Sequence, residues 1–176
     1  GSFINPYTLQ VERVGYDNPV LVTGEKIIIA TGSQPRNPDD IPFDHKVIVD
    51  STSILSMEKI PKSLMILGGG VIGSEYATIF AALGVKVTLF DRGERLLKFL
   101  DHEITEELKK NFPKDNVEYI NSCGDFTVEK KEDRAWVTLE SGASYSADCL
   151  FFALGREANT ASLKIENANI ILNKYH

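Results

Sequence analysis

The stretch Leu64–Phe80, LMILGGGVIGSEYATIF, places four glycines between an apolar segment typical of a buried strand and a segment typical of a helix. A glycine inside either element is less favourable than alanine by roughly 0.5–1 kcal/mol. The glycines therefore point to a backbone conformation or a close approach that other residues do not allow. Three of them, Gly68, Gly70 and Gly73, fit the pattern G-x-G-x-x-G. The pattern is weak alone, and its meaning depends on the elements around it.

The surroundings of this run meet the further conditions for a dinucleotide site. A strand is predicted before Gly68, a helix from Val71, and a second strand that ends at Asp91, 23 positions after Gly68. The unit from Leu64 to Asp91 has 28 residues (91 − 64 + 1). A strand–glycine turn–helix–strand unit of about 30 residues with an acid near its end is typical of dinucleotide binding. The sequence therefore predicts an NAD(P) site rather than a purely structural turn.

Each glycine of the pattern has its own expected role. Gly68 allows the tight turn, Gly70 lets the pyrophosphate approach the backbone, and Gly73 lets the helix pack against the strand. The backbone N–H groups at Val71 and Ile72 then face the phosphates, at the positive end of the helix dipole.

The acid at the end of the second strand carries the prediction about the ribose. Asp91 is expected to accept hydrogen bonds from the adenosine ribose hydroxyls, which favours NAD. Arg92 and Arg95 follow at once, and a pair of arginines is a usual phosphate ligand. Two interpretations stay open: an exposed loop that balances its own charges, or a site that accepts both NAD and NADP.

Two residues of the run keep open assignments. Glu75, expected in the first turn of the helix, either complements the helix dipole or reaches the nicotinamide end of the cofactor. Gly69 is not required by the pattern, and the sequence gives it no role.

The remaining sequence predicts an α/β fold. Hydrophobic periodicity and turn residues indicate strands and helices. They predict a hairpin over 7–24, a strand over 26–32, a strand over 47–49 with a helix after it, a helix over 71–84, a strand over 85–91, a helix over 101–112 and four strands over 117–121, 126–133, 135–142 and 147–155. The centre is a Rossmann-like unit with a parallel sheet and a β-meander, and both ends look like parts of another domain.

Composition excludes several classes of partner. A net charge of −6 does not suit nucleic acid, and no apolar run reaches the roughly 18 residues that a membrane span needs. With no signal peptide at the start, we expect a cytoplasmic protein without a membrane partner. Cys123 and Cys149 are too far apart for a redox or metal motif, and Cys149 is expected to be a buried thiol. The histidines His45, His102 and His176 are scattered, so no metal site is predicted.

Four segments carry a resemblance to a known family. IIIATGSQP, GGGVIGSE, LLKFLDHEITEEL and DCLFFALGREANT resemble the FAD-containing pyridine nucleotide oxidoreductases, which include lipoamide dehydrogenase and glutathione reductase. Within this family, VDSTSILSMEKIP, together with GSEYATIF and LLKFLDHE, is similar to the soluble pyridine nucleotide transhydrogenases. The resemblance covers nearly the whole chain. It implies an FAD domain interrupted by an inserted NAD(P) domain and followed by a dimer domain.

The resemblance also implies a domain assignment. Residues 1–59 correspond to part of the FAD domain, 60–155 to the NAD(P)-binding domain, and 156–176 to the return toward the FAD domain. The family's N-terminal FAD-binding glycine motif, its redox C-x4-C and its dimer domain have no counterpart in these 176 residues. We therefore expect this chain to bind NAD(P) and to lack FAD, and its parent to be a flavoprotein homo-oligomer.

Individual residues receive roles through the same resemblance. Thr31 and Gly32 match the family motif at the junction near FAD, and Gly155 matches a position close to bound cofactor. Glu75 matches a glutamate near the nicotinamide and the flavin. Val71 stands where the family often has a tyrosine over the flavin, so a tyrosine gate is not expected.

Three functions fit these observations. The first is a flavoprotein transhydrogenase whose parent moves hydride from NADPH to NAD⁺ through FAD, the isolated chain being inactive. The second is a disulfide reductase similar to dihydrolipoamide dehydrogenase. The third is a nucleotide-binding module without catalysis. A C-x4-C motif elsewhere in the gene separates the first two, and FAD-binding sequence upstream argues against the third.

Overall fold

A computed structural model describes residues 1–173 of the chain. The last three residues of the predicted 156–176 segment, which include His176, lie outside the described residues. The chain forms two compact units, one made of Gly1–Gln34 and the segment from Arg156 onward, the other of Pro35–Gly155. The glycine run lies in the second unit.

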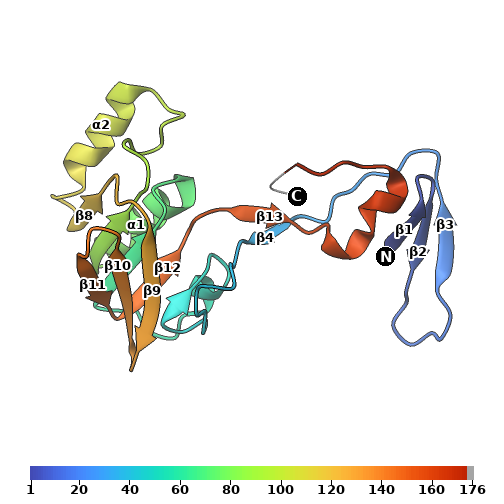
Figure 1. The fold of residues 1–176 in the computed structure, drawn as a ribbon, viewed down its shortest axis with the longest axis horizontal. Coiled ribbons are helices and arrows are strands. Elements are labelled where there is room, and N and C mark those ends of the chain that lie inside the picture. The colour runs from blue at the N-terminus through green and yellow to red at the C-terminus, as the bar shows by residue number, and fades with distance from the viewer. Residues whose placement is uncertain (174–176) are drawn as a thin grey trace. The chain divides into compact units, whose positions relative to one another are not determined.

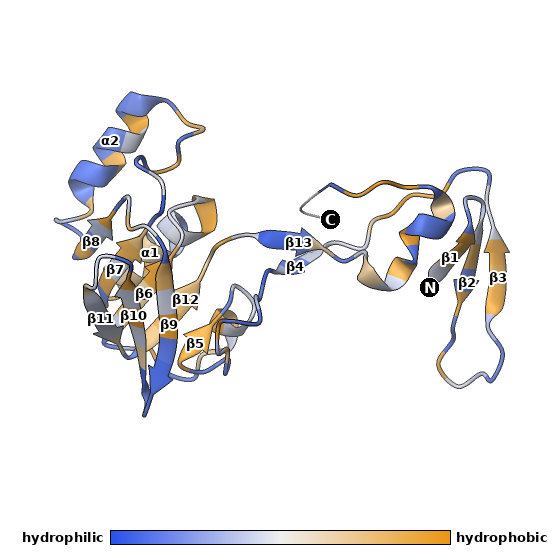
Figure 2. Cartoon of the chain, viewed as in Figure 1, coloured by the Kyte–Doolittle hydropathy of each residue, from blue (hydrophilic) through white to orange (hydrophobic). Residues whose placement is uncertain are grey.

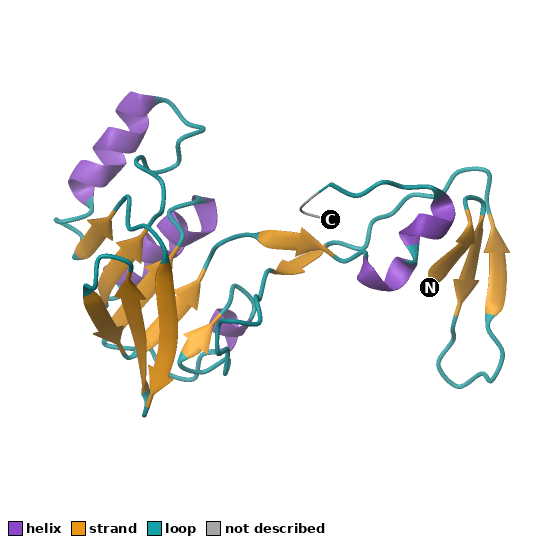
Figure 3. Ribbon diagram, in the orientation of Figure 1, coloured by secondary structure: helices purple, strands orange, loops and turns teal. Residues whose placement is uncertain are grey.

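Figures 1 and 3 show the elements of the two units. Their bounds, in chain order, are β1 (Ser2–Asn5), β2 (Thr8–Val11), β3 (Val20–Thr23), β4 (Ser33–Pro35), β5 (Ile48–Val49), the 3₁₀ helix η1 (Ser53–Ser56), β6 (Ser63–Leu67), α1 (Val71–Ala82), β7 (Lys86–Phe90), α2 (His102–Asn111), β8 (Val117–Ile120), β9 (Phe126–Lys131), β10 (Arg134–Leu139), β11 (Ser144–Ala147), β12 (Cys149–Phe152), β13 (Arg156–Ala158) and the 3₁₀ helices η2 (Ala161–Leu163) and η3 (Ile165–Ala168).

The second unit is built on a five-stranded parallel sheet in the order β5-β12-β6-β7-β8. Because β6 lies between β12 and β7, the strand order reverses beside β6. In open parallel sheets, ligands bind at the carboxyl ends of the strands where this reversal occurs. The predicted α/β fold with a parallel sheet is confirmed, and the glycine run begins at that edge.

Alternation along β6 explains how the sheet is buried on both faces. Leu64 and Ile66 belong to the core that includes Ala77 and Phe80 of α1. Met65 and Leu67 belong to a second core, shared with the antiparallel strands β9, β10 and β11. The strands of the sheet are accordingly among the most apolar parts of the chain (Figure 2). The β-meander therefore covers the face that α1 leaves open.

The structure corrects three local predictions. Residues 26–32 do not form a strand, and Ile28 is 88% exposed, because no partner strand pairs with this segment among the described residues. The helix predicted after residue 50 is only the single turn η1, which ends where Met57 becomes extended. The last predicted strand, 147–155, is the shorter β12, and neither β1 nor residues 144–146 of β11 were predicted as strand.

The first unit contains the antiparallel sheet β1-β2-β3, in which β2 and β3 form the predicted hairpin. Its β4 and β13 pair with each other. Residues 35–59 belong to the segment 1–59 that the sequence assigned to part of the FAD domain. In the structure they lie in the second unit, where β5 pairs with β12. That the two ends derive from an FAD domain stays a prediction.

Candidate nucleotide-binding site

Gly68 lies where the ends of three parallel strands meet. Its φ is +114°, a region that favours glycine. Its N–H donates to the carbonyl oxygen of Phe90, the last residue of β7, at 2.8 Å. A Cβ atom at this position would lie 2.7 Å from the carbonyl oxygen of Ala153, after β12. The turn therefore needs glycine both for its dihedral angle and for its contact with the neighbouring chain.

Gly73 and Gly70 need glycine for different reasons. A Cβ on Gly73 would lie 1.8 Å from the carbonyl oxygen of Gly68, so α1 could not start this close to β6 with any other residue. A Cβ on Gly70 would meet nothing within 4 Å. The protein itself therefore does not exclude a side chain at Gly70, and the position is open to an approaching group.

The open position adjoins the start of a helix. Gly70 is the N-cap residue of α1 and brings no side chain to cap it. Val71 and Ile72 are the first two residues of the helix, where backbone N–H groups have no intrahelical acceptor. Such a helix start attracts anions. The backbone at Gly70, Val71 and Ile72 therefore forms an open cradle beside N–H groups that have no acceptor within the helix.

Gly69 has a role that the sequence did not reveal. It is buried, and a Cβ there would lie 2.4 Å from Oδ2 of Asp91. The register pairs Leu67 with Phe90, so Gly69 lies beside the residue that follows β7. Gly69 makes room for the Asp91 carboxylate. Only the strand register could have indicated this, because the two residues are 22 positions apart.

Asp91 is held in place by the backbone around it. Its N–H donates to the carbonyl oxygen of Ile120 at 2.9 Å, and its carbonyl oxygen accepts from the N–H of Cys123 at 3.1 Å. The carboxylate Oδ1 accepts from the N–H of Gly93 at 3.0 Å. A half-buried, oriented carboxylate at the carboxyl end of β7 is suited to accept hydrogen bonds from hydroxyl groups.

The two arginines after Asp91 do different things. Arg92 pairs with Asp125, with 3.0 Å between Nη2 and Oδ1, and its guanidinium lies 4.7 Å from the ring centroid of Phe126. Arg95 instead donates to the carbonyl oxygens of Lys98 and Leu100 within its own loop. Arg92 therefore faces a surface hollow of about 300 Å³, whereas Arg95 closes a loop. The hollow is lined by Arg36, Pro38, Asp40, Ile41, Arg92, Phe126, Phe152 and Leu154.

Glu75 and Gly155 complete the predicted set in this unit. Glu75 is the fifth residue of α1 and is exposed, so it lies in the second turn and not in the first as expected. The helix begins at Val71 as predicted, and its first turn of about 3.6 residues ends before Glu75. Gly155 has a φ of +116°, and its carbonyl oxygen accepts from the N–H of Arg36 at 3.2 Å.

Thr31 and Gly32 belong to the other unit. Their carbonyl oxygens accept hydrogen bonds from Asn159, from its Nδ2 at 3.1 Å and from its backbone N–H at 3.0 Å respectively. Asn159, from the predicted return segment 156–176, thus joins that segment to Thr31 and Gly32 within this unit.

The cysteines are free and buried. Burial raises the pKa of Cys149 to about 12, with Asp44 as a further cause. The pKa of Cys123 is also raised, mainly by burial and next by the nearby Asp91 carboxylate. Both thiols therefore stay protonated at neutral pH and are poor nucleophiles. Over residues 1–173, no group of histidine, cysteine and acidic side chains is arranged to hold a metal ion.

The glycine turn, the oriented acid and the switch point coincide at one edge of the sheet. The chain belongs to the pyridine nucleotide-disulphide oxidoreductase family. The family model matches residues 7–176. Members of this family are oxidoreductases that use FAD and pyridine nucleotides, in agreement with the resemblance stated above. No helix within residues 1–173 is both long and apolar enough to cross a membrane.

Curated relatives are similar over nearly all of the chain. It is 45% identical over 170 residues to the soluble pyridine nucleotide transhydrogenase of Colwellia psychrerythraea, which covers 96% of this chain and 36% of the relative. It is 41% identical over 170 residues to the protein of the same name from Photobacterium profundum, with the same coverage. The chain thus spans about a third of the length of these relatives.

A solved structure is also similar. The HOCl-induced flavoprotein disulfide reductase RclA from Escherichia coli matches with a TM-score of 0.83 and 34% identity. The match covers 99% of this chain and 39% of RclA. It agrees with the fold of the family.

Proposed function

We propose that this chain is the NAD(P)-binding part of a soluble flavoprotein transhydrogenase, whose parent moves hydride from NADPH to NAD⁺ through FAD. The observation that carries the proposal is the open cradle at Gly70, beside an oriented Asp91 carboxylate at the switch point of the sheet. The printed names of the curated relatives support the choice of reaction.

The residues of the cradle receive their roles from this geometry. Gly68, Gly70 and Gly73, with the N–H groups of Val71 and Ile72, bind the pyrophosphate. The N–H groups and the helix dipole stabilise its charge, and the missing Cβ of Gly70 lets it approach.

The other predicted residues act on the two ends of the nucleotide. Asp91 accepts from the ribose hydroxyls, and Arg92 lies beside them over the hollow next to Phe126. Glu75 and Gly155 lie toward the nicotinamide. Thr31 and Gly32 mark the junction to an FAD domain in the parent.

FAD, when bound in the parent, supplies the hydride relay between the two nucleotides. The residues of this chain bind each nucleotide in turn and orient its nicotinamide. We infer that the 176-residue chain does not retain FAD and is inactive alone, because it holds a single G-x-G-x-x-G, which the NAD(P) cradle uses. We also infer that the parent is cytoplasmic and forms a homo-oligomer. Its partners are nicotinamide dinucleotides, and it binds neither nucleic acid nor a membrane. The word soluble in the relatives' names supports this location.

Calorimetry on the purified chain tests the proposal. We expect NADH and NADPH to bind, FAD not to bind, and Gly70→Val to abolish nucleotide binding while the protein stays folded. Thr127→Val, an exposed position on β9, is the matched control and keeps binding intact. Absence of nucleotide binding to the folded wild-type chain would overturn the proposal.

A second function is favoured by one observation. The similar solved structure is titled a flavoprotein disulfide reductase, so the same NAD(P) part could serve a disulfide reductase. The rest of the gene distinguishes the two, because a C-x4-C motif followed by lysine supplies the dithiol that a disulfide reductase needs. Its presence would replace the transhydrogenase with the reductase. A module without catalysis is the third possibility, and FAD-binding sequence in the gene would remove it.

A further inference from the structure

Tyr119 places a buried hydroxyl near the carboxylate of the candidate ribose site. It lies on β8, opposite Leu89 of β7, two residues before Asp91. Its ring packs edge-on against Phe112, with 6.0 Å between centroids. Its hydroxyl oxygen is fully shielded from solvent and has no hydrogen-bond partner among the described residues.

The group that acts most directly on this hydroxyl is Asp91. Burial raises the pKa of Tyr119, and the adjacent Asp91 carboxylate is the next cause, ahead of Cys123 and Glu106. The phenol therefore stays protonated and keeps its one hydrogen-bond donor. A buried donor without a partner is unfavourable, and a nearby carboxylate is the acceptor that would satisfy it.

The Asp91 carboxylate has capacity for this donor. Oδ1 already accepts from the N–H of Gly93, and Oδ2 lies against Gly69. An ionised carboxylate has about four acceptor positions. It can therefore accept from Tyr119 and from a ribose hydroxyl together.

We propose that Tyr119 is a positioning residue that sets nucleotide specificity: its hydroxyl donates to the Asp91 carboxylate and tempers the repulsion between that carboxylate and a 2′-phosphate. The inference rests on the proposed function, because a transhydrogenase site must hold NADH and NADPH in turn. An unmoderated carboxylate beside the 2′-position favours the nucleotide with a free hydroxyl and disfavours the one with a phosphate.

Nucleotide affinities of the full 176-residue chain test the proposal. Tyr119→Phe keeps the aromatic packing on Phe112 and removes only the hydroxyl. We expect the ratio of NADPH affinity to NADH affinity to fall by about three- to tenfold, within the range expected for one typical intramolecular hydrogen bond. Tyr145→Phe is the matched control, because its ring packs on Phe90 in the core that α1 does not touch, and it leaves the ratio unchanged.

A double-mutant cycle shows whether the effect passes through Asp91. In an Asp91→Asn background the repulsion is gone, so Tyr119→Phe should no longer change the ratio. Two results would overturn the proposal: an unchanged ratio in the single variant, or an equal change in both backgrounds. A parallel loss of both affinities leaves the ratio unchanged, so it is an instance of the first result and indicates a merely structural role.

A measurement without nucleotide separates this inference from the proposed function. NMR of the chain with ¹³Cζ-labelled tyrosine gives one resonance for each tyrosine. The resonance that disappears in Tyr119→Phe belongs to Tyr119. We expect Asp91→Asn to shift this resonance and to leave that of Tyr145 in place. If the wild-type chain binds neither nucleotide, the proposed function and the specificity role both fail, yet this shift still shows the contact. If nucleotides bind and the resonance does not move, the proposed function stands and the Tyr119 contact is wrong.

Discussion

Two apolar runs of nearly the same character end in glycine, and they adopt different structures. SLMILGGG, in the second unit, forms β6, and its residues from Leu64 to Leu67 are buried. KIIIATG, in the first unit, forms no strand at residues 26–32, and Ile28 is 88% exposed. Their difference lies in pairing, because β6 has β12 on one side and β7 on the other. A strand-like sequence becomes a strand only where the surrounding chain supplies partners for its backbone groups.

The same contrast holds for the two units as a whole. Within the described residues of the first unit, Phe3 and Ile165 are the buried apolar side chains, whereas the second unit contains two extended cores. The first unit also exposes large apolar side chains, such as Leu21, Ile28 and Ile171. The second unit therefore holds most of the burial that stabilises a fold, and four changes test this comparison.

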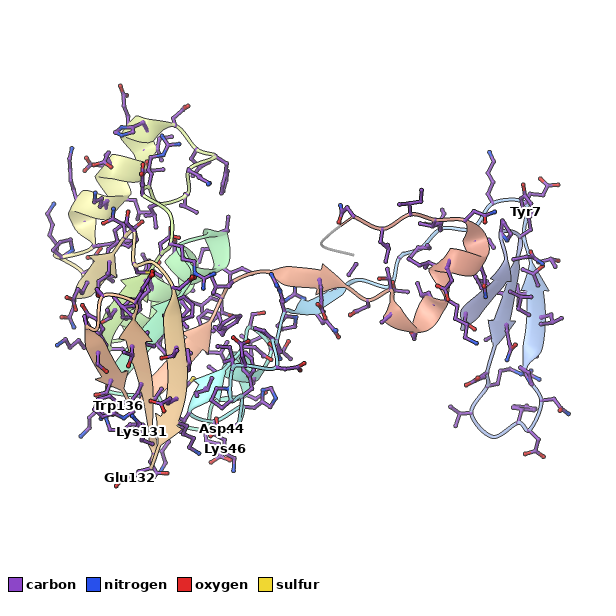
Figure 4. The ribbon with its side chains drawn as sticks, viewed as in Figure 1. Tyr7, Asp44, Lys46, Lys131, Glu132 and Trp136 are labelled. Carbon is purple, nitrogen blue, oxygen red and sulfur yellow. The ribbon has the colours of Figure 1, made fainter. Side chains whose placement is uncertain are left out.

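The largest effect is expected at Gly73. A valine there drives Cβ into the carbonyl oxygen of Gly68, 1.8 Å away, and neither backbone can move freely. We expect the second unit to lose about 3 kcal/mol or more of unfolding free energy. Urea unfolding followed by the fluorescence of Trp136 measures this unit alone, because Trp136 on β10 is the single tryptophan of the chain (Figure 4).

Gly70→Val is the control for this experiment. Its Cβ meets nothing within 4 Å, and its φ of −77° suits any residue. The free energy of unfolding should change by no more than about 1 kcal/mol, the usual cost of a poor N-cap residue. Equal unfolding midpoints for wild type and Gly73→Val would show that α1 does not pack on the turn as described.

Acid should destabilise the second unit next most strongly. Burial opposes ionisation of Asp50, but hydrogen bonds from Asn37, Ser53 and Thr52 outweigh it and lower its pKa from 3.8 to about 2. A depressed pKa contributes stability that is present above the unfolded value and lost as the pH falls through the folded value. We expect a loss of about 2 kcal/mol between pH 4 and pH 2 from Asp50, again followed by Trp136.

Asp50→Asn isolates this contribution. The amide oxygen still accepts hydrogen bonds, but the group no longer titrates, so the unfolding free energy should depend less on pH over the same interval. The pKa of Asp44 is also lowered, since Lys130 and three backbone N–H groups outweigh its burial, so part of the slope remains. A variant with the full wild-type slope would contradict the assignment to Asp50.

Excision of residues 35–155 should have a smaller effect on the second unit. The segment contains both cores and all five strands of the parallel sheet. The N–H of Arg36 donates to the carbonyl oxygen of Gly155 near the two cut ends, which lie close together. We expect the unfolding free energy reported by Trp136 to change by less than about 1 kcal/mol. An excised segment without a cooperative transition would show that the unit depends on its flanks.

Ile28→Ser should have the smallest effect. The side chain is 88% exposed, so its removal changes the free energy of unfolding by less than about 0.5 kcal/mol. Ile66→Ala, at the fully buried position on β6, is the counterpart and costs about 2–5 kcal/mol. Similar losses from the two isoleucines would break the comparison between the two apolar runs.

Much of the second unit was predictable because its signals are local. The apolar run before Gly68, the helix after Gly70 and the strand that ends at Asp91 follow from spacing alone. The helix expected after Asp50 was wrong, although Asp50 does accept the N–H groups of Thr52 and Ser53, because one capped turn does not make a helix when the chain then extends. Strand 26–32 was wrong for the reason given above, the lack of a partner.

The local order of residues was enough to indicate an α/β unit, a glycine turn at the carboxyl end of its first strand and an acid at the end of the next. It could not indicate that Gly69 lies against Asp91, or that Tyr119 lies opposite Leu89, two residues before Asp91, because both depend on the register of β6, β7 and β8. It could not separate Arg92 from Arg95 either, since Asp125 and Phe126, which contact Arg92, lie just before and at the start of β9, more than 30 positions along the chain. Contacts between residues distant in sequence depend on pairing and packing, and only the folded chain decides them.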